Sequence, residues 1–303
     1  MGKLRNWQLF AICVFTWGTT WYAITWQIGA VAPEVGVALR FAVAGLLVLG
    51  IAAGSGQRLR FGAREHGLFA LQGAFMYGVS YVFVYHAERH LVSGLVAVGY
   101  SATPLVSGIG ARLLFGAPLS SRFLAGGLIG LAGVAMIFWP EFGKAAGSSR
   151  TLIGVALTIA AVLMSVVGSL AASRNRRRGL PFWPALGWGM LYGALTCLLL
   201  ALARGDSFAL PATALWWGSL FYLALAGSVL TFACYLTLQD RIGPGPAGTI
   251  GVMTPLLALL VSMLFEGYRP DALTALGALL AIAGNGLMLT PPAPVRRVAA
   301  AVE

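Results

Sequence analysis

Charged residues are scarce in this chain, and those present lie mostly in short gaps between long apolar stretches. Only 10% of the 303 residues are Asp, Glu, Lys or Arg, whereas 59% are apolar. A soluble globular domain carries about 25% charged residues. The apolar stretches reach the roughly 20 residues that a helix needs to cross a bilayer. This composition excludes an ordinary soluble domain and predicts an all-α polytopic membrane protein.

Cysteine is rare as well, and its three copies lie inside apolar stretches. Cys13, Cys197 and Cys234 lack the spacing of a disulfide framework or of a metal site. We interpret them as small buried hydrophobic residues. The sequence therefore predicts no metal and no cofactor.

Signatures of enzymes and of ATP-driven proteins are missing too. The stretch from Gly243 to Gly248 matches G-x-G-x-x-G by letter. It follows no strand, contains prolines and opens an apolar stretch, so it does not predict a dinucleotide site. No Walker lysine motif is present, and an enzyme acting on lipid would need His, Asp or Ser gathered at the interface. We expect the protein not to be an enzyme.

Polar gaps divide the chain into ten apolar stretches, which predict ten membrane helices. These cover about 7–28, 34–54, 67–87, 91–115, 122–140, 151–172, 182–203, 214–238, 245–265 and 271–290. With the N-terminus inside, 14 of the 20 Lys and Arg residues fall on the inner side and five on the outer side. Both termini are then cytoplasmic. The net charge of +11 is thereby explained by topology, and no nucleic-acid partner is predicted.

A fixed offset of 151 residues superposes two parts of the chain without a gap. The stretch Gly94 to Pro140 falls on Gly245 to Pro291, including a Thr-Pro-Leu triplet at Thr103 and at Thr254. Such a match, which includes Gly and Pro, indicates an internal repeat.

Each repeat holds five spans, which is an odd number, so the second repeat enters the membrane upside down relative to the first. We divide the chain at 1–145 and 146–303. We expect two inverted-topology five-helix repeats around a central cavity.

Several short motifs point to a known family. They are Trp17-Gly18, Leu39-Arg40-Phe41, the Thr-Pro-Leu pairs with the Gly-rich spans that follow them, and Glu266 after the ninth span. With these motifs the chain resembles the drug/metabolite transporter superfamily in its ten-span EamA-type branch. Within that branch it is most similar to YddG-type exporters of aromatic and neutral amino acids. The first repeat departs from the pattern, because Phe115 and Gly116 stand where the family has an acidic residue.

The resemblance implies export of neutral and aromatic amino acids such as Phe, Met and Thr by alternating access in a bacterial inner membrane. Small multidrug antiporters of this superfamily use a membrane-embedded acid. Here no Asp or Glu lies well inside a predicted span, so we expect facilitated or weakly coupled transport. An exporter of drugs, nucleobases or other small metabolites, with proton coupling, stays open as the alternative, and so does a channel-like or lipid-scrambling protein. The expected partners are the amino-acid substrate and the lipid bilayer. A monomer is sufficient for the expected transport, and a homodimer is an open alternative.

The repeated prolines are candidate kink or gating positions. Pro104 and Pro255 lack an amide donor, which frees the carbonyls of Tyr100 and Gly251. In lipid a freed carbonyl costs several kcal/mol unless a partner satisfies it. Thr103, Thr254, water or a substrate ammonium are the candidate partners. A plain kink satisfied by neighbouring helices is the alternative.

Aromatic residues within the spans are candidates for lining the cavity. A tyrosine in the middle of a span needs a hydrogen-bond partner that lipid cannot supply, so it should face protein or a wet cavity. Core packing is the alternative. The candidates are Trp17, Trp21, Tyr77, Tyr81, Tyr100 and Trp188.

Arg40 is the only basic residue that lies well inside a predicted span. An ionisable residue within the membrane is a functional candidate, here for a substrate carboxylate. Its side chain could instead extend to the outer surface. Glu34, six residues earlier, lies on a different helix face and is not its natural partner.

Small residues recur at helical spacing in the fifth and tenth spans. They suit close contact between helices, and we expect packing within one chain rather than a dimer face. The residues are Gly126, Gly130, Gly133, Gly277, Ala281 and Gly284.

Overall fold

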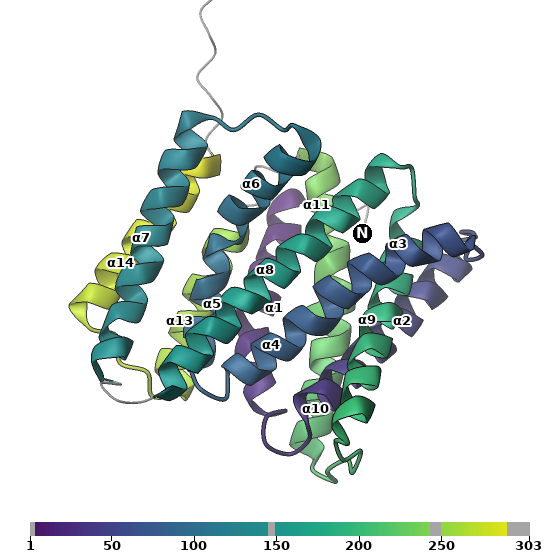
Figure 1. The fold of residues 1–303 in the computed structure, drawn as a ribbon, viewed down its shortest axis with the longest axis horizontal. Coiled ribbons are helices and arrows are strands. Elements are labelled where there is room, and N and C mark those ends of the chain that lie inside the picture. The colour runs from purple at the N-terminus through teal and green to yellow at the C-terminus, as the bar shows by residue number, and fades with distance from the viewer. Residues whose placement is uncertain (1–3, 145–148, 243–249, 290–303) are drawn as a thin grey trace, which may run out of the picture.

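The computed structural model describes residues 4–144, 149–242 and 250–289 (Figure 1). The expected boundary between 145 and 146, as well as Gly245 and Pro291 of the repeat, lie outside the described residues. Within the described ranges the chain forms ten helical segments, some of them interrupted by a turn of π-helix or 3-10 helix.

The first half begins with α1 and ends with α7. Its elements are α1 (Asn6–Thr25), α2 (Pro33–Gly54), α3 (Ala63–Gly73), the π-helix η1 (Ala74–Val79), α4 (Ser80–Ala87), α5 (Ser93–Gly99), the 3-10 helix η2 (Tyr100–Ala102), α6 (Thr103–Phe115) and α7 (Ser121–Lys144). The second half consists of α8 (Ser149–Arg177), α9 (Phe182–Arg204), α10 (Ala214–Ala224), the π-helix η3 (Leu225–Leu230), α11 (Thr231–Ile242), α13 (Ile250–Phe265) and α14 (Ala272–Leu289).

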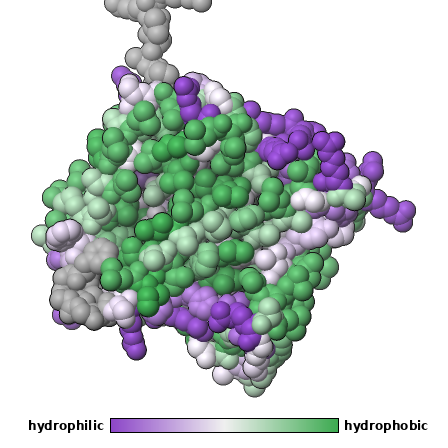
Figure 2. All heavy atoms as spheres, viewed as in Figure 1, coloured by the Kyte–Doolittle hydropathy of each residue, from purple (hydrophilic) through white to green (hydrophobic). Residues whose placement is uncertain are grey.

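Seven helices of the described residues are long and apolar enough to cross a membrane. Residues 253–265 and 272–288 form shorter apolar helices, and α1 has 20 residues whose Trp, Tyr and Thr lower its mean hydropathy. Figure 2 shows a broad apolar surface across the middle of one face, with hydrophilic residues at the upper right over the ends of α3 and α8 and along the lower edge. The predicted all-α polytopic membrane fold is confirmed, and ten as the number of crossings stays a prediction.

Two π-helices lie at matching places in the two halves. Residues 74–79 of η1 fall on residues 225–230 of η3 at the same offset of 151 that relates the sequence repeats. Equivalent residues of the two halves also make equivalent contacts around the two π-helices. Trp17 donates its indole N–H to the carbonyl of Gly227 in η3 at 3.1 Å. The residues equivalent to Trp17 and Gly227 are Gly168 and Met76, and these two also lie against each other. The apolar pattern of the sequence did not predict these π-helices.

The small-residue stretches pack α7 against α14, which lie side by side at one edge of the molecule (Figure 1). A Cβ added at Gly126 would lie 2.5 Å from the carbonyl oxygen of Gly284. A Cβ at Gly277 would lie 2.6 Å from that of Gly133, which is the same contact with the halves exchanged. The predicted packing within one chain is therefore confirmed for these residues.

The two Thr-Pro triplets differ in their helical context. In the first half α5 ends at Gly99, a 3-10 turn follows, and α6 starts at Thr103 just before Pro104. In the second half α13 continues through Pro255. A helix break at the proline is therefore found in the first half alone among the described residues.

Candidate functional site

A cavity between the two halves has a volume of about 130 Å³. Its walls come from α3 and η1 of the first half and from α8, α9 and α11 of the second half. The lining residues are Gln72, Met76, Tyr77, Ser169, Ala172, Ser173, Asn175, Arg176, Leu180, Phe182, Ala185, Leu186, Phe232 and Tyr235. We call this space the π-helix cavity, because η1 forms part of its wall.

One end of the π-helix cavity is polar and deeply buried. Asn175 is 1% exposed and donates its amide Nδ2–H to Gln72 Oε1 at 2.9 Å and to the carbonyl of Leu68 at 3.3 Å. Its Oδ1 atom has no hydrogen-bond partner among the described residues. An unpaired buried acceptor costs about 1–3 kcal/mol, so a donor that reached this oxygen after a small movement of the side chains covering it would be favoured.

Neither amide was among the residues predicted from the sequence. Gln72 stands alone within an apolar stretch, and Asn175 lies in the basic run Arg174 to Arg178, which reads as a topology anchor. Helix α8 continues to Arg177, beyond the predicted end near 172, and this extension places Asn175 on the buried face of α8. Gln72 could have been predicted as an interior polar residue, because it stands alone within an apolar span.

Aromatic side chains form another part of the cavity wall. The rings of Tyr77 and Phe232 lie 5.7 Å apart, with an edge-to-face arrangement. Trp17 contacts Phe232 at 5.3 Å and Tyr235 at 5.4 Å between ring centroids. The predicted candidate Tyr77 therefore lines this cavity, and Trp17 supports its wall from behind.

Three more predicted residues extend this aromatic cluster beyond the cavity. Tyr81 packs on Phe41 at 4.8 Å, and Trp21 packs on Tyr100 at 5.2 Å. The hydroxyl of Tyr100 is paired with that of Ser80 at 2.9 Å. Protein groups thus satisfy the Tyr100 hydroxyl, and these residues pack in the core next to the cavity.

Arg40 is buried in the interior and does not reach the surface, being only 1% exposed. Its Nε–H donates to Ser228 Oγ at 3.2 Å, and its guanidinium lies over the rings of Tyr81 and Phe41 at 4.7 and 5.1 Å. Glu34 pairs elsewhere, as the helix geometry predicts: its Oε1 lies 3.0 Å from His86 Nε2 and 3.7 Å from the Nε of Arg204.

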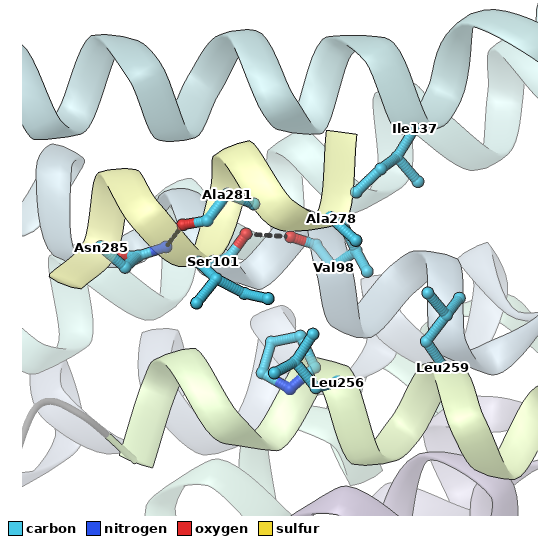
Figure 3. A pocket seen from close by; sticks show the side chains of 10 residues that line it. Val98, Ser101, Ile137, Leu256, Leu259, Ala278, Ala281 and Asn285 are labelled. Carbon is cyan, nitrogen blue, oxygen red and sulfur yellow. Dashed lines mark hydrogen bonds between the residues drawn. The ribbon is translucent and has the colours of Figure 1, made fainter. Parts of the chain in front are cut away.

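Pro255 borders a second, much smaller cavity of about 20 Å³ between α5, η2, α7, α13 and α14 (Figure 3). This is room for about one water molecule. Its polar lining residues are engaged locally, because Ser101 donates to the carbonyl of Val98 and Asn285 to that of Ala281. Pro255 therefore faces the protein interior, but in the described structure it is not part of the π-helix cavity.

The remaining predicted residues also lie apart from the π-helix cavity as described. Thr254 donates its hydroxyl to the carbonyl of Ile250 at 2.8 Å, whereas the buried hydroxyl of Thr103 has no partner among the described residues. Gly251 is exposed. Trp188 donates to the carbonyl of Leu59 at 3.1 Å. Pro104 occupies the first turn of α6.

Polar contacts join the two halves at the end of the molecule opposite the basic run 174–178. We call the end with the basic run 174–178 the inner end, following the predicted orientation, and the opposite end the outer end. At the outer end Ser93 donates its backbone N–H and its hydroxyl to Glu266, at 3.2 and 2.5 Å. The hydroxyl of Ser262 also bonds to Glu266 and accepts the N–H of Gly94 at 2.9 Å. These contacts bind the start of α5 to the end of α13.

Comparison with known proteins identifies the family. The EamA-like transporter family matches this chain twice, over residues 6–139 and 152–290. The chain belongs to this family. It is therefore a multi-pass membrane transporter rather than an enzyme, and the resemblance to the drug/metabolite transporter superfamily is confirmed.

Individual relatives agree with this assignment. Protein PecM of Dickeya dadantii is 27% identical over 266 residues, which cover 87% of this chain and 84% of PecM. The uncharacterized inner membrane transporter YedA of Escherichia coli is 28% identical over 84% of this chain and 80% of its own length. A crystal structure of a protein aligns with a TM-score of 0.68 at 19% identity, over 93% of this chain and 96% of the other, which shows a shared fold.

Proposed function

We propose that this transporter exports neutral and aromatic amino acids, such as Phe, Met and Thr, across a bacterial inner membrane. The observation that carries the proposal is the π-helix cavity, which combines an aromatic wall with an unpaired amide oxygen. Sites of this kind are mostly apolar, with a few polar groups that fix orientation.

The polar and apolar parts of the cavity suit the two ends of an amino acid. The substrate ammonium would donate to Asn175 Oδ1, and an apolar or aromatic side chain would pack against Tyr77 and Phe232. Arg176 supplies positive charge at the inner rim for the carboxylate. Gln72 and Asn175 are neutral, so a substrate with a charged side chain would gain no buried counter-ion from them.

An inverted repeat allows alternating access, because each half can adopt the conformation of the other. In the described conformation the outer end is closed by Glu266, while the cavity lies near inner-end residues such as Arg176. We assign this conformation to the inward-facing state. If the two halves of an inverted repeat exchanged their conformations, the result would be the outward-facing state, with both termini cytoplasmic throughout. Transport is then facilitated or weakly coupled.

The test is counterflow in liposomes that contain the purified protein, with labelled Phe, Met, Thr, Glu and Lys. We expect saturable exchange of Phe, Met and Thr, and little exchange of Glu or Lys. Absence of saturable exchange for every amino acid would overturn the proposal. Labelled nucleobases in the same vesicles test the alternative substrate class, and flux that rises without saturation would indicate a channel.

A further inference from the structure

Glu88 is a buried acid at the outer end, and its carboxyl oxygens accept no hydrogen bond in the described structure. It follows the last residue of α4, is 8% exposed, and neither carboxylate oxygen has a hydrogen-bond partner among the described residues. An isolated buried carboxylate is expensive, and such a group usually becomes neutral by binding a proton. Glu88 lies just beyond a predicted span, where the sequence indicates an exposed residue, so its burial could not be predicted from the sequence.

The titratable groups around Glu88 come from three other elements and from its own. They are Arg40 of α2, Glu266 after α13, Tyr100 of η2 and, one turn earlier in the chain, Tyr85 of α4. Arg40 has an Nη1 atom without a partner in the described structure, and Glu266 is already engaged by Ser93 and Ser262. The cluster therefore contains one buried cation and two acids, of which only Glu88 lacks hydrogen bonds.

We propose that Glu88 is a proton-binding site that controls opening of the outer end. In the closed conformation described here the carboxyl group is protonated and neutral. When the outer end opens, Glu88 meets external water and releases its proton, and the carboxylate then faces Arg40 in a wet environment. The proton enters and leaves from the outer side only, so it acts as a gating ligand and is not carried across the membrane.

The electrostatics give the direction of the pH effect. Burial, and then the negative charge of Glu266, raise the pKa of Glu88 well above its ordinary value of 4.5, while Arg40 partly opposes this rise. The closed state therefore binds the proton more tightly than an open, hydrated state. Its extra stability is complete below the ordinary carboxyl pKa and is lost as the pH rises through the raised pKa. Acid outside should hold the outer end closed.

The first experiment detects the proton itself. Infrared spectra of the purified protein at neutral pH should contain a band of a protonated carboxyl group that disappears in Glu88→Gln. An unchanged band in that variant would overturn the proposal. This measurement needs no substrate, so it is independent of whether the transported solute is an amino acid.

The second experiment follows counterflow while the external pH changes and the internal pH stays fixed. We expect the initial rate of the wild type to rise with external pH, on the order of ten-fold for each unit by which closure raises the pKa. Glu88→Gln mimics the protonated state and should stay at the slow acid rate at every pH. A wild-type pH profile in this variant would assign the titration to another group, such as the His86–Glu34 pair.

Two further variants complete the test. Glu65→Gln removes an acid at the inner end but keeps the oxygen that caps Gly62, so it should retain the wild-type pH profile. Glu88→Asp keeps a carboxyl group and should retain both the infrared band and the pH response, which guards against a misfolded Gln variant. A pH gradient should change rates without changing the final substrate ratio, and accumulation driven by the gradient would overturn the gating role.

Discussion

At the residue scale, the proposed substrate contact depends on a single amide. Asn175 is fixed by Gln72 and Leu68, and it leaves its Oδ1 unpaired at the polar end of the π-helix cavity. A hydrogen bond from a charged donor contributes about 1.5–3 kcal/mol. The amide therefore has enough binding energy to distinguish an amino acid from an apolar solute.

Replacing this amide should weaken transport more than it weakens the fold. Asn175→Leu should raise the KM for Phe counterflow roughly ten-fold or more, because the ammonium loses its acceptor. The matched control is Asn285→Leu, which removes another buried amide, one that borders the small cavity and bonds within its own helix. That control should keep the wild-type KM. An equal loss in both variants would contradict the assignment of Asn175.

The environment of Arg40 requires a planar cation. One guanidinium lies over two rings and also bonds to Ser228, which a compact ammonium cannot do at the same time. We expect Arg40→Lys to lower the free energy of unfolding by about 1–3 kcal/mol, measured as a lower Tm in detergent. Arg58→Lys is the control, because Arg58 is exposed over Phe61 at 5.7 Å and should change stability little. Equal Tm shifts for the two variants would argue against this environment.

At the element scale, the two π-helices and the α7–α14 contact both occupy equivalent places in the two halves. Each π-helix frees backbone carbonyls, and in η3 these accept bonds from Trp17 of α1 and from Thr231 of α11. π-helical turns are frequently found at functional sites. Here η1 forms part of the cavity wall, and η3 holds Arg40 through Ser228.

The α7–α14 contact leaves no room for a side chain at Gly126, Gly133, Gly277 or Gly284. A Cβ at Gly133 would lie 2.5 Å from the carbonyl oxygen of Gly277, so Gly133→Ala should force the helices apart and cost about 1–3 kcal/mol. Gly50→Ala is the matched control in α2, where nothing lies within 4 Å of the added Cβ. We expect a lower Tm for the first variant and an unchanged or slightly higher Tm for the second. The opposite order would contradict the close contact.

At the scale of the whole molecule, the expected inversion of the halves makes a topological prediction. Five crossings between the N-terminus and residue 145 would place that position outside, and five more would return the C-terminus to the cytoplasm. A tag inserted at 145 should react with an impermeant reagent in intact cells, whereas a tag at 298 should react only after permeabilisation. Reaction of both tags from the same side would contradict the inverted arrangement.

The sequence by itself determined the class of the molecule, the approximate helix positions and the internal repeat. These follow from local properties, because the length and polarity of each stretch decide whether it can cross lipid. It also singled out Trp17, Arg40 and Tyr77, since aromatic and charged residues are conspicuous within apolar spans.

Only the tertiary structure decided which polar residues lie inside the protein. Glu88 and Asn175 stand near span ends, where a sequence reading expects water, yet helices distant in the chain cover them. The structure also showed helix α13 continuing through Pro255, while the π-helical turns η1 and η3 interrupt two other spans. Burial at a helix end and the site of a π-helical turn depend on contacts between spans far apart in sequence, which local pattern and propensity do not encode.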